Sequence, residues 1–304
     1  MKTKHIVCIA DMPSEDVREI LRTAHELKTA HKRGEANRCL EGKTLGMIFE
    51  KPSLRTRVSF EVGMTQLGGS SVYLSREDIK MRDREAPEDV AKVISRYVDG
   101  LMLRTFSHET IVLFAEHATV PVINGLSDYV HPCQALGDLM TAEENKGDLA
   151  AVKIAFIGDG NNVARSLAFA CAKLGAAIAL AAPEGYELDE DTMARLRDEA
   201  DVTQGTDPHA AVADADVVYT DVWAGMGQEG EASKRERIFQ RFRVDADLLA
   251  GAKPDAVFMH CLPAHRGEEV TDEVLDGPQS VVLDQAENRM HVQKAITKLL
   301  MSSR

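Results

Sequence analysis

The residues best suited to chemistry lie where an apolar run ends and a helical pattern begins. The run 44–49 is followed by Ser53, Arg55, Thr56 and Arg57 at the start of a helix-like segment. A helix N-terminus offers unpaired backbone N–H groups and the positive end of the helix dipole, so it favours an anion. Hydroxyl and guanidinium groups add further donors for an oxyanion. This segment predicts a phosphate or carboxylate site.

Further polar residues follow apolar runs or begin helical patterns. Arg104 ends the run 100–104, and His131 and Gln134 flank Pro132 at the start of an amphipathic pattern. Asp221 and Cys261 directly follow the runs 216–220 and 256–260. In open α/β sheets, ligands bind beyond the carboxyl ends of the strands. These residues are therefore candidate ligand contacts, and His131 with Gln134 would suit polarisation of a carbonyl group.

The pattern of the whole chain supplies the elements that position these residues. The 304 residues suggest two domains of about 150 residues each. Strands are expected near 44–49, 71–74, 100–104, 120–125, 153–157, 177–181, 216–220 and 256–260, and helices near 14–33, 53–67, 88–97, 108–117 and 290–301. This alternation predicts an α/β fold with a parallel sheet in each domain. The stretch 76–87 is rich in charge and predicts an exposed loop.

Composition narrows the class of protein. The net charge of −13 disfavours non-specific nucleic-acid binding, and no apolar run approaches the length of about 20 residues that crosses a membrane. The apolar patch near the start of the chain is ended by Asp11, so a cytoplasmic protein is expected. The five cysteines show no short paired spacing, which predicts neither a disulfide framework nor a zinc site. His260, Cys261 and His265 are close in sequence, but their spacing matches no metal-ligand pattern.

A glycine turn opens the second half of the chain. Gly158 and Gly160 follow an apolar run, as in a dinucleotide-binding fingerprint, but Val163 stands where the third glycine belongs. This weakens a nicotinamide-binding interpretation. The tandem Asn161 and Asn162 suggest hydrogen bonding to a small polar ligand instead.

Taken together, the motifs resemble the aspartate/ornithine carbamoyltransferase superfamily, and those of the second half resemble its ornithine enzymes. The matching segments are Ser53-Leu54-Arg55-Thr56-Arg57, Arg104, His131-Pro132-Cys133-Gln134, Asp221-Val222-Trp223, His260-Cys261-Leu262-Pro263 and Glu287-Asn288-Arg289. The resemblance implies two α/β domains linked by helices. Residues 1–134 would bind carbamoyl phosphate, with the helix 290–304 packed back onto them, and residues 135–289 would bind ornithine.

The resemblance also implies an activity and a set of site residues. The expected reaction transfers the carbamoyl group of carbamoyl phosphate to the δ-amine of L-ornithine, giving citrulline and phosphate for arginine biosynthesis. No metal or organic cofactor is implied, and the expected assembly is a homotrimer whose subunits share active sites. The implied catalytic residues are Arg55, Arg104, His131 and Cys261. The implied carbamoyl phosphate ligands are Ser53, Leu54, Arg55, Thr56, Lys80, Arg104, His131, Gln134, Cys261, Leu262 and Arg289, and the implied ornithine ligands are Asn162, Asp221, Gly225 and Met226.

Two departures from the family pattern leave the amine acceptor open. Gly225 stands where the family usually has serine, and Lys80 stands where it usually has glutamine. A related carbamoyltransferase acting on putrescine or an acylated ornithine is therefore an alternative. Two others are a nicotinamide oxidoreductase built on the glycine turn and a homologue that binds ligand without catalysis.

Overall fold

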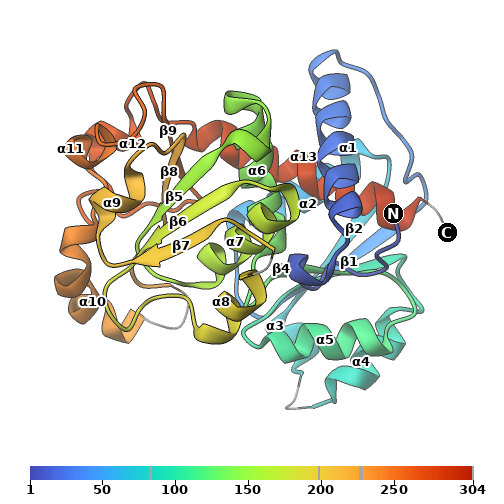
Figure 1. Cartoon of the computed structure of the whole chain (residues 1–304). Coiled ribbons are helices and arrows are strands. Elements are labelled where there is room, and N and C mark those ends of the chain that lie inside the picture. The colour runs from blue at the N-terminus through green and yellow to red at the C-terminus, as the bar shows by residue number, and fades with distance from the viewer. Residues whose placement is uncertain (82–83, 198, 226–228, 303–304) are drawn as a thin grey trace. The chain divides into compact units, whose positions relative to one another are not determined.

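The computed structural model describes residues 1–81, 84–197, 199–225 and 229–302 and divides into two compact units (Figure 1). Unit 1 comprises Met1–Gly137 and Asn288–Arg304, and unit 2 comprises Asp138–Glu287. Each unit holds one parallel sheet with helices packed against it. The predicted fold class, two α/β domains with parallel sheets, is confirmed.

The sheet of unit 1 has four strands in the order β2-β1-β3-β4. Its strands are β1 (Thr44–Phe49), β2 (Ser70–Ser75), β3 (Gly100–Arg104) and β4 (Val122–Leu126). Its helices are the 3-10 turn η1 (Ile9–Asp11), α1 (Ser14–Lys32), α2 (Leu54–Gln66), α3 (Arg76–Ile79), α4 (Pro87–Ile94) and α5 (His108–His117). In this sheet Phe49 pairs with Arg104, so the end of β3 lies level with the turn that precedes α2.

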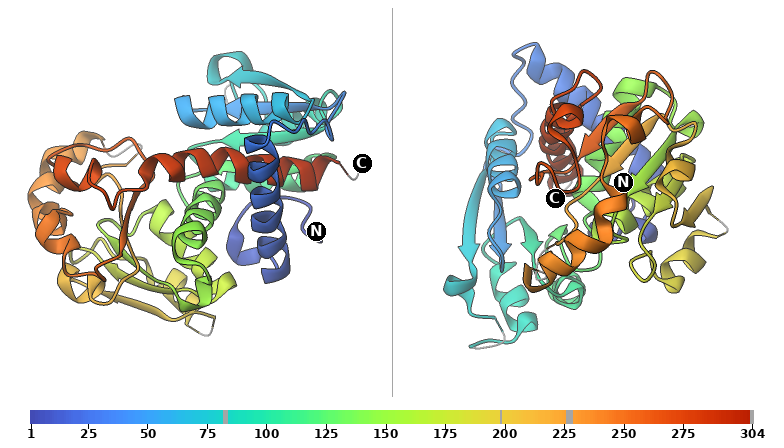
Figure 2. Two further views of the ribbon diagram at one scale, coloured as in Figure 1. Left: turned by 90° about the horizontal axis from the view of Figure 1, so that it is seen from above. Right: turned by 90° about the vertical axis from the view of Figure 1, so that its left-hand side faces the viewer.

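Helices cover both faces of this sheet. On one face, side chains of β1, β3 and β4 pack against α4 and α5 in one buried cluster: Ile48, Leu101, Leu103, Val122, Val90, Ala91, Ile111 and Phe114. On the other side, α1 crosses α13 (Val282–Met301), and Nζ of Lys28 on α1 donates to Oδ1 of Asn288 on α13 at 2.7 Å (Figure 2). A side chain at Gly100 would lie 2.9 Å from the sulfur of Met301, so α13 approaches β3 closely at that glycine.

The sheet of unit 2 has five strands in the order β7-β6-β5-β8-β9. Its strands are β5 (Lys153–Ile157), β6 (Ala177–Ala181), β7 (Val202–Gly205), β8 (Val217–Thr220) and β9 (Val257–His260). Its helices are α7 (Asn162–Leu174), α8 (Glu190–Leu196), α9 (Pro208–Val212), α10 (Ala232–Phe239), α11 (Ala246–Leu249) and α12 (Asp272–Leu275). Three 3-10 turns complete it: η2 (Leu149–Ala151), η3 (Glu229–Glu231) and η4 (Gln240–Phe242).

One face of this second sheet packs against α9, α11 and α12. The buried cluster includes Ile157, Val218, Phe258, Val212, Leu248, Leu249 and Val274. Thr220 of β8 pairs with His260 of β9 in the parallel register. The residues that follow these two strands, Asp221 and Cys261, therefore leave the sheet at the same level.

Two helices contain the boundaries between the units. The boundary after Gly137 lies within α6 (Pro132–Lys146), and the boundary after Glu287 lies within α13. The boundaries expected from the sequence, after residues 134 and 289, fall within the same two helices.

Several details differ from the expectations. Helix α1 ends at Lys32, one residue before the predicted end at 33, and α4 ends at Ile94 rather than Tyr97. Helix α13 begins at Val282, eight residues before the predicted start at 290. The stretch expected to be a loop contains the one-turn helix α3, because Ser75 and Asp78 form a reciprocal capping box. Strand β7 had no counterpart among the predicted strands.

Across the described residues, no helix combines the length and the hydropathy that would let it cross a membrane.

Candidate active site

Ser53 and Thr56 build the start of α2 as an anion-binding turn. Ser53 is the N-cap of this helix, and its Oγ accepts a hydrogen bond from the backbone N–H of Thr56 at 3.4 Å. The Ser53 hydroxyl also donates to Oγ1 of Thr56 at 3.1 Å. Thr56 is completely buried. Its side chain is thus fixed within the turn whose N–H groups would face an oxyanion.

Arg289 reaches this turn from the C-terminal helix. Its guanidinium Nη2 donates a hydrogen bond of 3.0 Å to Oγ1 of Thr56, and the side chain is buried. Gly137 on α6 makes room for it, because a Cβ at this glycine would lie 3.1 Å from Cγ and 3.3 Å from Cα of Arg289. A positive charge is therefore held beside the start of α2 by a residue far away in the sequence.

Arg104, His131 and Gln134 lie in the same unit and are all buried. Arg104 ends β3, His131 immediately precedes α6, and the backbone N–H of Gln134 donates to the carbonyl of His131 at 3.1 Å. Burial, together with the positive charges of Arg289 and Arg104, holds the pKa of His131 well below its usual range. The imidazole is therefore neutral near pH 7 and retains one N–H that can donate to a carbonyl oxygen.

Cys133 lies between His131 and Gln134 but has a different character. It is fully buried, and its thiol donates to the carbonyl of Asn124 at 3.5 Å. Burial raises the pKa of Cys133 to about 12. This thiol is a core residue and not a nucleophile.

The other residues of the start of α2 are more exposed. Arg55 is half-buried, whereas the Leu54 side chain is largely exposed. Arg57, a candidate oxyanion ligand in the sequence, is engaged elsewhere: its Nε donates to Glu61 at 2.9 Å, and its guanidinium lies 4.1 Å from the ring centroid of Tyr73. The expectation that Arg57 is an oxyanion ligand is corrected. Its guanidinium pairs with Glu61, four residues further along the helix, and stacks on the ring of Tyr73 on β2.

Lys80 is exposed and follows the short helix α3. It adopts a left-handed backbone conformation, with φ of 47°, and its N–H donates to the carbonyl of Arg76. A non-glycine residue in this region carries a conformational cost, so the end of α3 is held by its capping bonds. Among the residues that the structure describes, the Lys80 side chain makes no hydrogen bond or ion pair with Ser53, Arg55 or Thr56 of its own chain.

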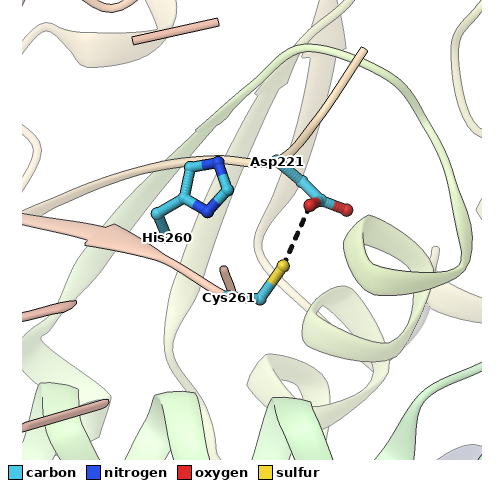
Figure 3. Close-up of side chains that lie close together, drawn as sticks. All are labelled: Asp221, His260 and Cys261. Carbon is cyan, nitrogen blue, oxygen red and sulfur yellow. Dashed lines mark hydrogen bonds between the residues drawn. The ribbon is translucent and has the colours of Figure 1, made fainter. Parts of the chain in front are cut away.

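In unit 2, Asp221 and Cys261 meet beyond the carboxyl ends of β8 and β9. The Cys261 thiol donates to Oδ1 of Asp221 at 2.9 Å (Figure 3). The backbone N–H of Val222 donates to the same oxygen at 2.8 Å. Asp221 is buried and Cys261 half-buried. A carboxylate and a thiol are thus placed side by side, suited to an ammonium and an amine of one ligand.

Asn161 completes this group; the sequence pointed to the pair Asn161 and Asn162, but the ornithine ligands implied by the family resemblance included only Asn162. Its Nδ2 donates to Oδ2 of Asp221 at 2.9 Å. Its Oδ1 accepts from the N–H groups of Val163 and Ala164, which makes Asn161 the N-cap of α7. The predicted residue, Asn162, is the first residue of the helix. The preference for asparagine at N-caps was the signal that could have separated the two.

His260 holds the backbone around Cys261. Its Nδ1 accepts from the N–H of Leu262 at 2.9 Å, and its Nε2 lies 3.2 Å from Oε1 of Glu269. The backbone N–H of His260 donates to Oε1 of Gln285 at 2.8 Å. Leu262 has a positive φ of 57°, a conformation that these bonds help to hold. The ring is therefore a positioning group for the Cys261-Leu262 turn.

Two groups of potential metal ligands occur among the described residues. Asp221, His260 and Cys261 form one, and His265, Glu268 and Glu269 form the other, each with its ligand atoms within 4.8 Å of one another. In the first group, both ring nitrogens of His260 are already engaged, so ligation would break a bond to Leu262 or to Glu269. In the second group, a metal ion would have to compete with His260 for the Glu269 carboxylate. The absence of a metal remains a prediction.

Arg235 and Asp159 hold the segment that follows Asp221. Arg235 Nη1 lies 3.0 Å from Asp159 Oδ2 and donates to the carbonyl of Trp223 at 2.8 Å. Burial raises the pKa of Asp159 to about 6, although the guanidinium of Arg235 opposes this shift. Gly225 lies just beyond this anchored segment, while Met226 lies outside the described residues.

The glycine turn 158–160 is closed by the protein's own backbone. The N–H of Gly160 donates to the carbonyl of Tyr186 at 2.7 Å. A Cβ at Gly160 would lie 2.4 Å from the carbonyl carbon of Glu187 and 2.5 Å from the nitrogen of Leu188. Glycine is therefore required here for contact with residues 186–188, which argues against a dinucleotide pyrophosphate at this turn.

Comparison with protein families gives a match along almost the whole chain. Residues 4–144 match the aspartate/ornithine carbamoyltransferase carbamoyl-P binding domain. Residues 150–300 match the Asp/Orn binding domain of the same family. The two matches correspond in order to the two halves predicted from the motifs.

Individual relatives are similar over their full lengths. A protein of Pyrococcus furiosus named "Ornithine carbamoyltransferase, anabolic" is 54% identical over 98% of this chain and 96% of its own length. The ornithine carbamoyltransferase of Bacillus subtilis is 52% identical over 98% of this chain and 94% of its own length.

Solved structures give the same result. The ornithine carbamoyltransferase structure from Pyrococcus furiosus has a TM-score of 0.96 at 53% identity, covering 99% of this chain and 98% of that one. The structure from Thermus thermophilus has a TM-score of 0.90 at 41% identity, covering 99% and 100%. The superfamily indicated by the sequence motifs is confirmed, and the chain belongs to the aspartate/ornithine carbamoyltransferase family.

Proposed function

We propose that this protein is an enzyme that transfers the carbamoyl group of carbamoyl phosphate to the δ-amine of L-ornithine, giving L-citrulline and phosphate in arginine biosynthesis. The observation that carries the proposal is the pairing of Asp221 with Cys261 at 2.9 Å, in a chain whose relatives of this length are named ornithine carbamoyltransferases. The carboxylate would bind the α-ammonium of ornithine, and the thiol would lie near its δ-amine.

The carbamoyl phosphate half of the proposed site is in unit 1. The phosphate would bind at the start of α2, to Ser53, Arg55 and Thr56. Leu54 would contribute backbone contact. Arg289, which donates to Thr56, would place a further positive charge beside the phosphate. Arg104, His131 and Gln134 would bind the carbamoyl end. The geometry of Ser53, Thr56 and Arg289 supports this assignment, since it holds donors around one helix start.

The ornithine half of the proposed site is in unit 2. Asp221 and Asn162 would bind the amino-acid end, and Asn161 would orient the Asp221 carboxylate. Gly225 and Met226 complete the proposed ornithine ligands. Cys261 and Leu262 would lie at the reacting end, where carbamoyl phosphate and the δ-amine meet. We assign residues 1–134 with 290–304 to carbamoyl phosphate binding and residues 135–289 to ornithine binding.

The proposed chemistry needs no covalent enzyme intermediate and no cofactor. The neutral δ-amine attacks the carbamoyl carbon, the bond from that carbon to the phosphate oxygen breaks, and the proton lost by the amine ends on the departing phosphate. Neutral His131 and the cationic Arg55 and Arg104 would stabilise the oxyanion and the departing phosphate. Holding both substrates in attack geometry would supply much of the rate enhancement.

We also infer a homotrimer in which the segment 76–86, including Lys80, contributes to a neighbouring active site. Exposed apolar side chains on α2 and β2 support an association surface on unit 1: Leu54, Val58, Val62 and Val72. Cys8, Cys39, Cys133, Cys171 and Cys261 are all free thiols, which suits a cytoplasmic enzyme.

A colorimetric citrulline assay tests the proposed activity. Purified protein with carbamoyl phosphate should form the ureido product from L-ornithine at a far higher rate than from putrescine or Nα-acetyl-L-ornithine. Preference for putrescine would replace the acceptor assignment, because putrescine has no α-carboxylate or α-ammonium. Binding of carbamoyl phosphate with no turnover of any of the three amines would overturn the enzymatic proposal.

A further inference from the structure

Unit 1 contains a cavity that shares no lining residue with the carbamoyl phosphate half of the proposed site. It has a volume of about 300 Å³ and lies where the ends of α1 and α2 approach α13. Its polar lining comes from His31, Glu35, Asn37, Gln66 and Lys294. Leu27, Ala30 and Ala36 give it apolar walls. A cavity of this size with a few polar groups is the usual form of a small-molecule site.

Lys294 places a buried ammonium in this cavity. The residue is only 3% exposed, and its Nζ donates to Oε1 of Gln66 at 2.8 Å. An ammonium has three donors, and Gln66 is its one hydrogen-bond acceptor among the residues that the structure describes. The Lys294 stem packs on α2, since a Cβ at Gly63 would lie 3.1 Å from its Cγ. The charge is therefore held in place and incompletely satisfied by the protein.

The surroundings of Lys294 compensate its charge only in part. Burial lowers the pKa of Lys294, with a smaller opposing effect from Cys39. An anionic group would relieve the desolvation of Lys294.

The one carboxylate among the residues that line the described cavity is exposed. Glu35 lies just beyond the end of α1, and its Oε1 is 3.9 Å from Nη1 of Arg33, too far for a hydrogen bond. The last carbonyl groups of α1 add partial negative charge on the same side. The cavity thus combines a buried cation with a negative, exposed edge.

These charges exclude the simplest ligands. A phosphate dianion would meet Lys294 favourably but would be repelled by Glu35 and by the helix ends. A simple cation would be repelled by Lys294. A zwitterion with a short apolar body matches the cation, the carboxylate and the apolar walls together. We propose that this cavity binds a small aliphatic α-amino acid, with its carboxylate on Lys294 and its α-ammonium toward Glu35.

Three matched compounds test the proposal: L-valine, 3-methylbutanoate, which lacks the α-amino group, and isobutylamine, which lacks the carboxylate. Binding is followed by the methyl NMR signals of Leu27, Ala30 and Ala36 in the full chain. An Asp221→Asn background removes amino-acid binding at the site proposed for ornithine, so the two sites are tested separately. Valine should bind more tightly than either analogue and should shift the three cavity methyl signals.

Substitutions at the two charges should separate their roles. Lys294→Met keeps the stem and removes the charge, so it should weaken both valine and 3-methylbutanoate by about tenfold or more. Glu35→Gln should reduce the affinity for valine toward that for 3-methylbutanoate and leave the latter unweakened. Lys298→Met, one turn further along α13 and outside the cavity lining, is the matched control and should change neither.

A second variant covers the case in which Lys294→Met does not fold. Ala36→Glu places a carboxylate on an exposed residue of the cavity wall and keeps Lys294. The new carboxylate should compete with the ligand and weaken valine binding. Failure of the full Asp221→Asn chain to bind valine at this cavity, or equal affinity for valine with and without Ala36→Glu in that chain, would overturn the proposal.

Discussion

Arg289 and Thr56, which are 233 positions apart in the chain, are joined by a hydrogen bond of 3.0 Å at the start of α2. Thr56 is completely buried, and its hydroxyl also accepts from Ser53. The C-terminal helix therefore takes part in shaping the anion-binding turn that the N-terminal motif builds. The first prediction tests this relationship.

Replacement of Thr56 by valine should weaken the use of carbamoyl phosphate. The substitution keeps the shape of the side chain but removes the hydroxyl that accepts from Arg289. Loss of a hydrogen bond to a charged group costs about 1.5–3 kcal/mol, so the Michaelis constant for carbamoyl phosphate should rise roughly ten- to a hundred-fold. Thr65→Val, on the same helix, removes an exposed hydroxyl that donates to the backbone carbonyl of Glu61 within α2, and it should have little effect. Equal kinetics in the two variants would contradict the role of Thr56.

Asn161 has two functions that substitutions can separate. Asn161→Ala removes the cap of α7 and the donor to Asp221, so it should lower the free energy of unfolding by about 1 kcal/mol and weaken ornithine binding. Asn161→Ser restores a capping hydroxyl but no amide donor. It should recover stability without recovering ornithine affinity, as measured by urea unfolding and steady-state kinetics. Recovery of both would show that Asn161 acts only as a cap.

Cys261 should affect ornithine more than carbamoyl phosphate. Cys261→Ser keeps a group that can donate to Asp221 but replaces the larger sulfur, whereas Cys261→Ala removes the donor. The Michaelis constant for ornithine should rise in both variants, and more in the alanine variant. Titration of each substrate at saturation of the other measures this. Equal losses for both substrates would point to a structural cysteine.

The lowered pKa of His131 should make the stability of the protein depend on pH. Its pKa is lowered well below the ordinary value of 6.5 by burial and by Arg289 and Arg104, so the unfolded chain binds a proton that the folded protein excludes. Above pH 6.5 the contribution of His131 to the free energy of unfolding is complete. As the pH falls below 6.5 that contribution is lost, and the free energy of unfolding decreases by at most about 1.4 kcal/mol per pH unit. His131→Gln should remove this slope from urea unfolding curves between neutral and mildly acidic pH. His209→Gln, at an exposed position, should keep it.

Substitution of Lys80 tests whether the segment 76–86 acts in catalysis. Lys80→Gln should change the Michaelis constant for carbamoyl phosphate and its salt dependence, because an ammonium would be removed from the phosphate. Stability should not change, since both residues bear the same cost in the left-handed conformation. Lys92→Gln, an exposed lysine on α4, is the matched control.

Mixed oligomers test whether Lys80 acts across subunits. Inactive Arg55→Ala and Lys80→Glu chains should regain activity when they are unfolded and refolded together, but only if the two residues of one site come from different subunits. Unchanged kinetics in Lys80→Gln, or no recovery in the mixture, would contradict the shared-site proposal.

The local sequence determined the positions of many strands and helices of this protein. Apolar runs that alternate with amphipathic segments specify strands and helices through burial alone, so β1, β3 and α5 could be placed almost to the residue. Ser53 could be identified as the start of a helix, because an N-cap bond joins residues three apart. The motifs at strand ends indicated the family.

Tertiary structure decided which of these residues meet. The register of β8 with β9 brings Asp221 to Cys261, and the packing of α13 brings Arg289 to Thr56. Arg57 has the same residue type as Arg55, but Tyr73 on a neighbouring strand and Glu61 engage it. Asn161, the N-cap of α7, contacts Asp221 beyond the end of β8. Such contacts depend on how separate elements pack, and sequence spacing carries no direct signal of that packing.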